Sequence, residues 1–420
     1  MTLVEIMITL IISSIIAAST FMFFAGQQRV YETQTKLLNI QQNIWAAMEI
    51  LSRYTRASGS GMFECIRPAS YANTSSTSGG RYQSTSPSRG PLTFNLASPP
   101  TAGVRAYSAT NGMQWIPPLW IVDNSTTDSG VSDKTDIITL AFGSQTSGTD
   151  IDVMLSLNVT NTLPGNPLPL NGANTSNMFR GGEFVLLLST PIFGYGADPS
   201  DDRGCTMFQV TDYAPNVSVL QHQSVASDGI VWNPPANQPT MFPASGGYTG
   251  GSAGVRNFGT LTWVRFFISP DATTGIPNLM LQQLHRGGSA GQPQVLAEGI
   301  EDLQVSFACD TGELLAHDLA NVNGTLDEGY DSPTKVTVEW WNNVDGDSLP
   351  AINTDGYCNL PTAIRLTLVA RTLSPDDLVD PTLNGPMDVE NHVYATPRPT
   401  DSFRRRVLST TVYPRNNKPL

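Results

Sequence analysis

The feature that most constrains this chain is its apolar N-terminus, which holds one carboxylate, Glu5, and then no ionisable side chain from Ile6 to Gln28. An apolar stretch of about twenty residues is long enough to cross a bilayer as a helix. A carboxylate in such a stretch costs on the order of 3 kcal/mol at the membrane centre and less at the interface. Glu5 therefore needs a compensating partner or has a function of its own.

The residues around this stretch favour a retained anchor over a secretory signal peptide. A signal peptide has a basic region before its apolar core and a small-residue cleavage site after it. Here no basic residue precedes the apolar run, and more helical sequence follows it. We therefore expect residues 1–28 to form an apolar helix that stays in the membrane or in a filament core.

A second helical pattern continues over residues 29–58, where apolar residues recur at alternating spacings of three and four. The "ASGSG" at 57–61 predicts the end of the helix. One helix of roughly 55 residues would be on the order of 80 Å long. We expect its apolar stripe to pack on the chain's own head; a coiled-coil dimer is the alternative, although two heptads are short for one. The stripe comprises Leu37, Ile40, Ile44, Ala47, Leu51 and Tyr54.

Beyond residue 58 the pattern changes to the alternation of β-strands, so we expect a β-rich head over 59–420 and an α+β fold. In "EDLQVSFACD" the residues Leu303, Val305, Phe307 and Cys309 share one face. In "TAIRLTLVAR" we expect the aliphatic side chains to point inward and Arg365, Thr367 and Arg371 outward. A semi-independent subdomain within 85–260 is a further possibility. The other strand candidates are "DIITLAFG", "EFVLLLST", "TMFQVTDY", "LTWVRFFISP", "NLMLQQLHR", "KVTVEWW" and "RRRVLSTTVYP".

The charge of the chain is unevenly distributed. The formal net charge is −13, and because residues 1–58 carry four basic and three acidic side chains, the head carries −14. A body this acidic repels nucleic-acid backbones, so we expect no nucleic-acid partner. The basic run 404–406 lies on a strand pattern that alternates its side chains between two faces, which favours ion pairs with the acidic head over a DNA groove.

The four cysteines permit disulfides in an exported protein, with three possible connectivities. We favour Cys309–Cys358, since both residues border predicted strands, which leaves Cys65–Cys205. The sequence contains no C-x-x-C pair, the spacing that would indicate a zinc site.

No motif in the sequence supports catalysis, and we expect a protein that is not an enzyme. The strings "GGSAG" at 250–254 and 287–291 match a nucleophile elbow, but no helical pattern follows either of them. The four histidines lack metal-ligand spacing. Carboxylates near glycines, Asp327, Asp331, Asp345 and Asp347, are weak Ca²⁺ candidates without the full twelve-residue signature, so we expect no cofactor and regard solvated turns as the better interpretation.

The N-terminal sequence "MTLVEIMITLI" resembles the mature N-terminus of type IV pilins, from which a prepilin peptidase has removed a leader before Met1. The resemblance implies that Met1 is N-methylated, although phenylalanine is the usual first residue in that family. It also implies that Glu5 pairs with the N-terminal amine of a neighbouring subunit and fixes the register of the filament. Apolar residues of the same segment would pack in the filament core, among them Leu3, Val4, Ile8 and Ile12.

Motifs of the head resemble the PilW family of minor pilins, which shares its plan with the J-type minor pseudopilin of type II secretion. They include "VLAEGIEDLQVSFACDTG" (295–312), "PTAIRLTLVAR" (361–371) and "FRRRVLSTTVYPRN" (403–416). Residues 70–130 and 215–260 lie outside the resemblance. The family implies a type IV pilin fold and a subunit that primes pilus assembly from the inner membrane, with its head in the periplasm. It would then lie at the extracellular pilus tip with other minor pilins, the major pilin and a large PilY-type adhesin.

Three other functions remain compatible with the sequence: a pseudopilin of type II secretion, a DNA-uptake pilin, which the acidic head disfavours, and an anchored periplasmic enzyme, for which no site emerges.

Overall fold

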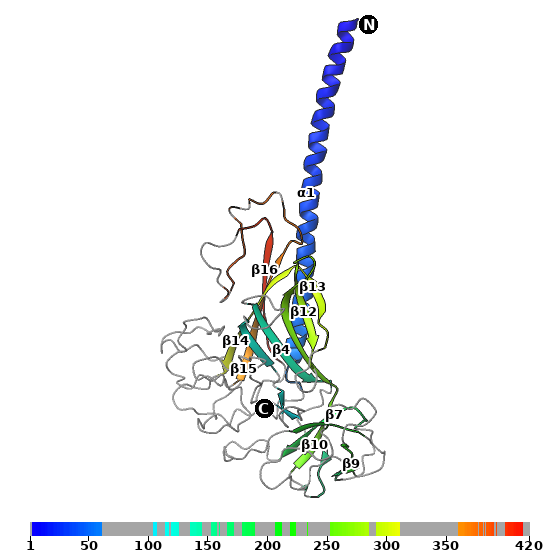
Figure 1. Cartoon of the computed structure of the whole chain (residues 1–420), viewed down its shortest axis with the longest axis vertical. Helices are drawn as coiled ribbons and strands as arrows, with labels where there is room; N and C mark the ends of the chain where they lie inside the picture. Colours follow the sequence, from blue (N-terminus) through cyan, green and yellow to red (C-terminus); the bar gives the residue numbers. More distant parts are fainter. Residues whose placement is uncertain are drawn as a thin grey trace, which may run out of the picture.

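The computed structural model describes residues 2–60, 104–106, 114–116, 119–125, 135–144, 153–157, 159, 166–171, 179–189, 206–211, 219–223, 233, 253–284, 291–310, 360–376, 378–380, 382, 384–389, 392 and 400–414. A single long helix, α1, projects from a β-rich head, with the N-terminus at the far end of the helix (Figure 1). This is the α+β architecture that the sequence predicts, with sheets that are almost entirely antiparallel.

Helix α1 runs from Leu3 to Ala57 without interruption. It contains no proline, the residue that most disrupts a helix interior, and Gly26 is its one glycine. Ser58 is its C-cap residue, followed by Gly59 in the left-handed conformation at φ 75°, as the "ASGSG" signal predicts. The described helix therefore joins the apolar and amphipathic segments into one rigid rod.

The described strands of the head form four sheets. In hydrogen-bonded order, a six-stranded sheet contains β2 (Gln114–Ile116), β1 (Val104–Ala106), β8 (Thr206–Gln209), β7 (Phe184–Ser189), β10 (Ala253–Gly259) and β5 (Val153–Met154). In the same order, a five-stranded sheet contains β13 (Gln294–Glu298), β12 (Pro277–Gln283), β11 (Leu261–Pro270), β4 (Thr135–Gly143) and β3 (Leu119–Ser125). A three-stranded sheet contains β14 (Ile300–Asp310), β15 (Leu360–Arg371) and β16 (Arg405–Val412), and a small one pairs β6 (Leu168–Pro169) with β9 (Val219–Leu220).

The chain passes from one sheet to the next at two glycines. Gly259, at φ 74°, is the last residue of β10 and precedes β11 by two positions, and Gly299, at φ 75°, lies between β13 and β14. A side chain at Gly299 would also meet the Arg371 carbonyl oxygen at 2.8 Å. Only glycine adopts this backbone conformation without strain, so these two positions allow strands of adjacent sheets to follow each other directly.

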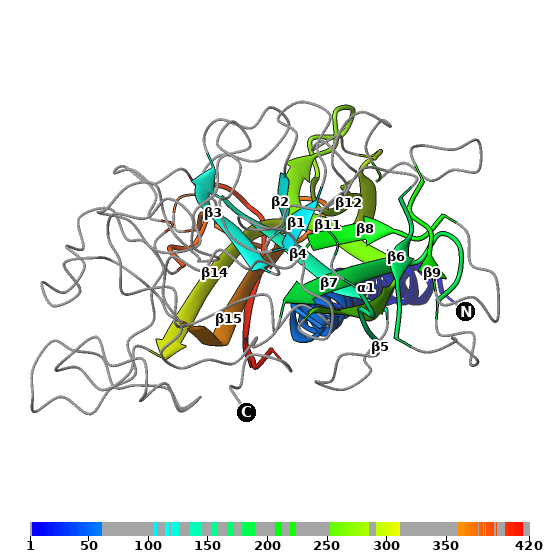
Figure 2. The ribbon, with the colours of Figure 1, turned by 90° about the horizontal axis from the view of Figure 1, so that it is seen from below.

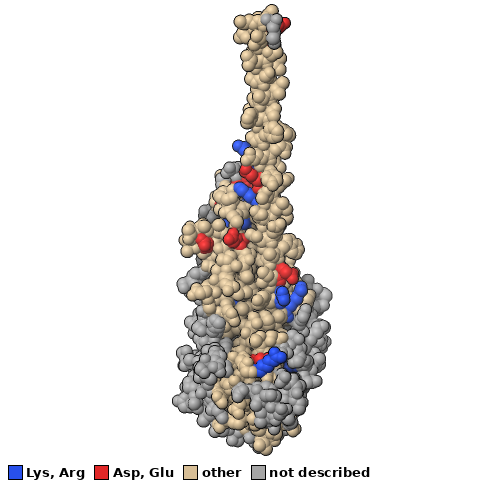
Figure 3. Space-filling model, turned by 90° about the vertical axis from the view of Figure 1, so that its right-hand side faces the viewer, with Lys and Arg blue, Asp and Glu red and all other residues tan. Residues whose placement is uncertain are grey.

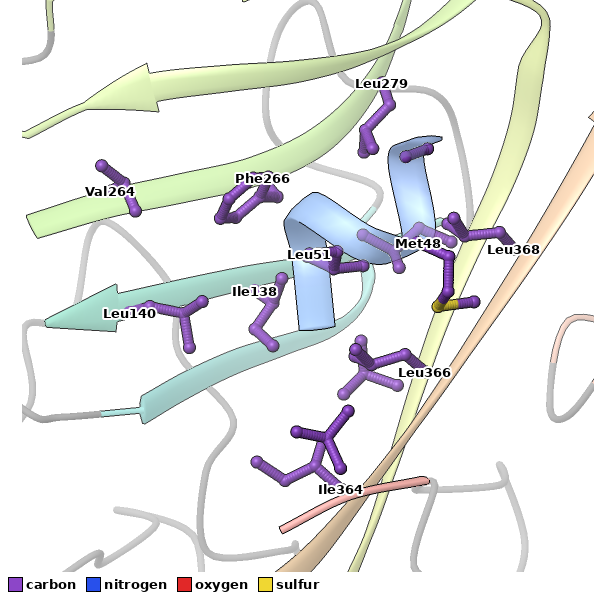
Figure 4. Close-up of a cluster of buried hydrophobic side chains, with 14 of the residues drawn as sticks. Met48, Leu51, Ile138, Leu140, Val264, Phe266, Leu279, Ile364, Leu366 and Leu368 are labelled. Atoms are coloured by element: carbon purple, nitrogen blue, oxygen red, sulfur yellow. The ribbon is translucent and has the colours of Figure 1, made fainter. Parts of the chain in front are cut away.

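The main hydrophobic core lies where the lower half of α1 meets the five- and three-stranded sheets. Figure 4 shows Met48 and Leu51 of the helix among aliphatic and aromatic side chains of β4, β11, β12 and β15. Leu51, Ile138, Phe266 and Leu366 are completely buried. Burial of each such side chain contributes roughly 1.5–3 kcal/mol, so this core fixes the helix to the head.

A second core lies on the opposite face of the six-stranded sheet. In β7, Phe184 and Leu186 belong to the main core, whereas Val185 and Leu187 belong to the second core. The alternation of a strand thus places apolar side chains on both faces of this sheet. The second core draws its residues from between 155 and 255, and β6, β7, β8 and β9 lie to one side of β14 and β15 in the view from below (Figure 2).

Most predicted strands that fall on described residues are present at close to their expected bounds, while "KVTVEWW" (335–341) lies outside the described residues.

One detail of the predicted side-chain orientation was wrong. Thr367 does not face solvent: it is 3% exposed, and its hydroxyl donates to Ser409 Oγ over 3.0 Å. The same face of the sheet also buries Asp302, Gln304 and Ser306. Strand alternation separates two faces, but it does not show whether the polar face is covered.

Candidate assembly surface: the N-terminal helix and its junction with the head

The upper half of α1 is an exposed column of apolar side chains. Leu3, Val4, Ile8 and Ile12, predicted to pack in a filament core, are all more than half exposed. Figure 3 shows this part of the helix without charged side chains between the acidic group at its tip and the first basic group further down. The helix is long and apolar enough to cross a membrane. Because exposed apolar area on this scale is unfavourable in water, lipid or other helices must cover it.

Several hydroxyl groups of the apolar segment are satisfied within the helix. Thr9 Oγ1 donates to the Glu5 carbonyl oxygen over 2.9 Å, and Ser19 and Thr20 donate to carbonyl oxygens four residues earlier over 2.8 Å. Ser14 Oγ donates to the Ile11 carbonyl oxygen over 2.8 Å. An unsatisfied polar group is costly in an apolar medium, so these bonds make the segment compatible with lipid or with a helix bundle.

Glu5 has a local role that the sequence-based predictions missed. The Thr2 backbone N–H donates to Glu5 Oε2 over 2.7 Å, and the Glu5 N–H donates to Thr2 Oγ1 over 3.4 Å. The two residues thus form a capping box at the start of α1. The Thr-x-x-Glu spacing is the sequence signal for this motif. The box satisfies two backbone N–H groups that a helix start leaves without partners.

The lower half of α1 packs on the head through the stripe that the sequence predicts. Ile40, Ile44 and Leu51 are buried in the main core, and Leu37 packs against it partly buried. Two polar contacts lie beside the stripe. Asn43 Nδ2 donates to the Glu298 carbonyl oxygen over 3.1 Å, and Lys36 Nζ donates to the Pro375 carbonyl oxygen over 2.9 Å.

A cluster of ion pairs braces the three-stranded sheet. Arg405 forms a bidentate contact with Glu301, at 2.6 Å from Nε to Oε2 and 3.0 Å from Nη2 to Oε1. The same guanidinium contacts Asp401, with 2.7 Å from Nη1 to Oδ1. Burial alone would lower the pKa of Arg405, but hydrogen bonds from its guanidinium to both carboxylates outweigh burial and raise that pKa. The Arg405 side chain is 2% exposed, whereas the Glu301 and Asp401 side chains are 15 and 25% exposed, so this cluster is a part-buried network.

Arg404 makes a separate contact, with 2.5 Å between its Nε and Asp376 Oδ2. Burial raises the pKa of Asp376, but hydrogen bonds from Arg404 and from the Leu378 N–H outweigh it and hold that pKa below its usual value. Lys36 of the helix adds a favourable charge. The arginines at 404 and 405 therefore bind carboxylates of the head, as their strand pattern predicts.

Two buried histidines lie in different parts of the head. His392 Nδ1 lies 2.7 Å from Asp302 Oδ2 on the polar face of the three-stranded sheet. His222 packs edge-on against Phe208 in the second core, at 5.3 Å between ring centroids. Burial lowers the pKa of His222 to about 4. Both residues are at most 4% exposed, which suits a structural role and not contact with a substrate.

The described parts of the candidate catalytic and metal motifs lack the expected context. Each "GGSAG" string leads into a strand, β10 or β13, and not into the helix of a nucleophile elbow. Among the described residues, no group of three or more histidines, cysteines or carboxylates could hold a metal. The calcium candidates Asp327, Asp331, Asp345 and Asp347 lie outside the described residues. So do Met1, Cys65, Cys205 and Cys358, and only the backbone of Cys309 is described.

These features define a class of protein: an α+β head carried on one long helix whose free half is built for an apolar environment. Residues 265–416 match the family model described as type IV pilus-assembly protein W, PilW, and this match supports a relationship of the chain to the PilW family. The matched segment runs from within β11 to just beyond β16 and contains β13 and β15. No curated protein and no solved structure shows significant similarity to the chain. The family is one of structural components of pilus assembly.

Proposed function

We propose that this protein is a minor pilin that primes type IV pilus assembly and then lies in the pilus tip. One observation carries the proposal: the exposed apolar half of α1 continues directly into a half that is buried against the strands matched by the PilW model. An anchor alone would need no rigid connection to the head. A subunit that is lifted from the membrane into a filament needs one, because the head must follow the helix.

Several finer assignments belong to this proposal. A prepilin peptidase cleaves before Met1, which is then N-methylated. The apolar half of α1 packs against the other minor pilins and the major pilin, and Glu5 sets the register by pairing with a neighbouring N-terminal amine. A charge in apolar surroundings requires such a partner. The head engages a PilY-type adhesin, and the protein moves from the inner membrane to the extracellular tip.

The test is a deletion strain complemented with the full chain, in which surface pili and secreted proteins are measured in parallel. We expect loss of surface pili with normal secretion, and recovery of pili on complementation. Loss of exoprotein release with intact pili would assign the protein to type II secretion instead. Normal pili and normal secretion would contradict both assignments.

A further inference from the structure

The long connection between β15 and β16 lies on the side of the head that faces the N-terminus of α1. Its described parts are 372–376, 378–380, 382, 384–389, 392 and 400–404. Leu368, near the end of β15, packs in the main core with Met48 of the helix (Figure 4). A few residues later, the Pro375 carbonyl oxygen accepts a hydrogen bond from Lys36 Nζ over 2.9 Å. The chain thus runs along α1 towards its N-terminus as it enters the connection, which Figure 1 shows above β16.

Hydrogen bonds fix the shape of this connection at its base. The Asp376 N–H donates to the Ser402 carbonyl oxygen over 2.8 Å, which extends the pairing of β15 and β16 beyond the ends of both strands. Asn384 Nδ2 donates to the Phe403 carbonyl oxygen over 2.7 Å. Because these bonds join the outgoing and the returning chain, the described residues between them hold a fixed place on the head.

Three large apolar side chains of the connection are exposed. Leu373, Leu378 and Met387 are 42, 56 and 44% exposed. Leu378 lies in a tight turn, in which the Val379 N–H donates to the Asp376 carbonyl oxygen over 2.9 Å. Turns in water usually carry glycine, proline, asparagine, aspartate or serine. A leucine in the turn, with two more exposed apolar residues on the same connection, indicates contact with an apolar medium.

The level of the connection along α1 matches the surface of a bilayer. No ionisable side chain occurs from Ile6 to Gln28, a length of about 34 Å that fits a hydrocarbon core of about 30 Å. Arg29 then marks the edge of this core, and Lys36, which contacts the connection, lies only ~10 Å further along the helix. The headgroup layer on each side of the core is roughly 5–7 Å thick. A segment that extends from the level of Lys36 towards the N-terminus of α1 therefore reaches this layer.

The charges near the connection suit a lipid surface of mixed charge. Asp380 and Asp388 of the connection are exposed, and so are the basic residues Arg29 and Lys36 of the helix. The two signs occur together, so the contact does not depend on strongly anionic lipid. The bilayer also lies beside the connection whenever α1 spans it, because anchor and head belong to one rigid rod.

We propose that the connection between β15 and β16 is a membrane-surface contact, in which Leu373, Leu378 and Met387 enter the headgroup layer of the bilayer that holds α1. The contact keeps the head against the membrane in one orientation, and it breaks when the helix leaves the bilayer. The inference goes beyond the proposed function: it requires α1 in a membrane, but not a place at the pilus tip.

The test places the fluorescent amino acid dansylalanine at Leu378 of the full chain, which is reconstituted at low density into phosphatidylcholine vesicles. Leu157 is the matched control, because it is a leucine with 65% exposure that follows Leu155 of the second core. That core includes residues of β7 and β10, at the end of the head farthest from the N-terminus (Figure 1). Phosphatidylcholine with a nitroxide on the acyl chain close to the headgroup should quench the probe at Leu378 several-fold more strongly than the probe at Leu157. A probe at Met387 should respond like the probe at Leu378.

Equal quenching at Leu378 and Leu157, in chains that float with the vesicles, would overturn the inference and leave the proposed function intact. A chain that does not float with the vesicles would contradict both the inference and the membrane stage of the proposed function. The pili of the deletion strain test the proposed function separately, so the two can fail independently.

Discussion

The backbone N–H of Thr2 donates to Glu5 Oε2 over 2.7 Å, so the carboxylate that we expect to set filament register also caps its own helix. The two roles make different demands. A capping box requires a hydrogen-bonding side chain at the third helical position, for which glutamine serves as well as glutamate. Pairing with an N-terminal amine requires the negative charge.

Glu5→Gln and Thr2→Ala therefore separate the two roles of Glu5. We expect Glu5→Gln to lower the amount of the protein in sheared filaments at least about tenfold, which corresponds to a loss of only ~1.4 kcal/mol. Thr2→Ala removes the cap, worth about 1 kcal/mol, without removing the charge. It should change incorporation less. Quantitative immunoblots of sheared pili measure the incorporation of both variants. Incorporation of Glu5→Gln at the level of the unmodified protein would leave capping as the only supported role of Glu5.

Leu51→Ala should destabilise the head. Leu51 is completely buried between the helix and the sheets, and replacement of such a leucine by alanine costs about 2–5 kcal/mol. Leu38→Ala is the matched control on the same helix, with an expected change within about 0.5 kcal/mol because its side chain is exposed. Denaturant unfolding of the full chain in detergent measures the free energy of both. Similar losses in the two variants would contradict the assignment of the two helix faces.

Arg405→Ala should destabilise the three-stranded sheet by about 1–3 kcal/mol, because it leaves the part-buried carboxylates of Glu301 and Asp401 without their cation. The neighbouring Arg406→Ala is the control, since Arg406 is exposed. Its effect should stay within about 0.5 kcal/mol. The same unfolding measurement compares the two, and a near-neutral Arg405→Ala would show that the cluster contributes little to stability.

His222 should make the head sensitive to acid. Burial lowers the pKa of His222 to about 4, against about 6.5 in the unfolded chain, so the unfolded state binds the proton more readily between these values. Stability is therefore full above pH 6.5 and falls as the pH drops toward 4, by about 3 kcal/mol in total. His222→Gln should be less stable at pH 7 but should lose less between pH 7 and 5. Thermal unfolding at both pH values tests this, and parallel losses in the two proteins would contradict it.

The sequence predicted the structure best where the spacing of apolar residues fits only one kind of secondary structure. The three-four spacing of Ile40, Ile44 and Leu51 belongs to one helix face, and the head buries that face. Local signals also sufficed for the helix end at "ASGSG" and for the strand that carries Arg405. These features depend on residues that are close in the chain, and so a single sequence can predict them.

Contacts between distant segments could not be predicted in this way. The pairing of Arg405 with Glu301 and the approach of His392 to Asp302 each join residues about a hundred positions apart. Nothing in the local pattern shows that the polar face around Asp302 is covered.

The most direct test of the central claim, that this chain is a processed pilus subunit, is the intact mass of the protein from sheared surface filaments without reduction, with sequencing of its N-terminal peptide. We predict that the chain is present, that it begins with N-methylated Met1, and that its mass fits two disulfides, the number that the pairs Cys65–Cys205 and Cys309–Cys358 require. Absence of the chain from filaments that are otherwise complete, or an unprocessed N-terminus longer than Met1, would contradict the claim.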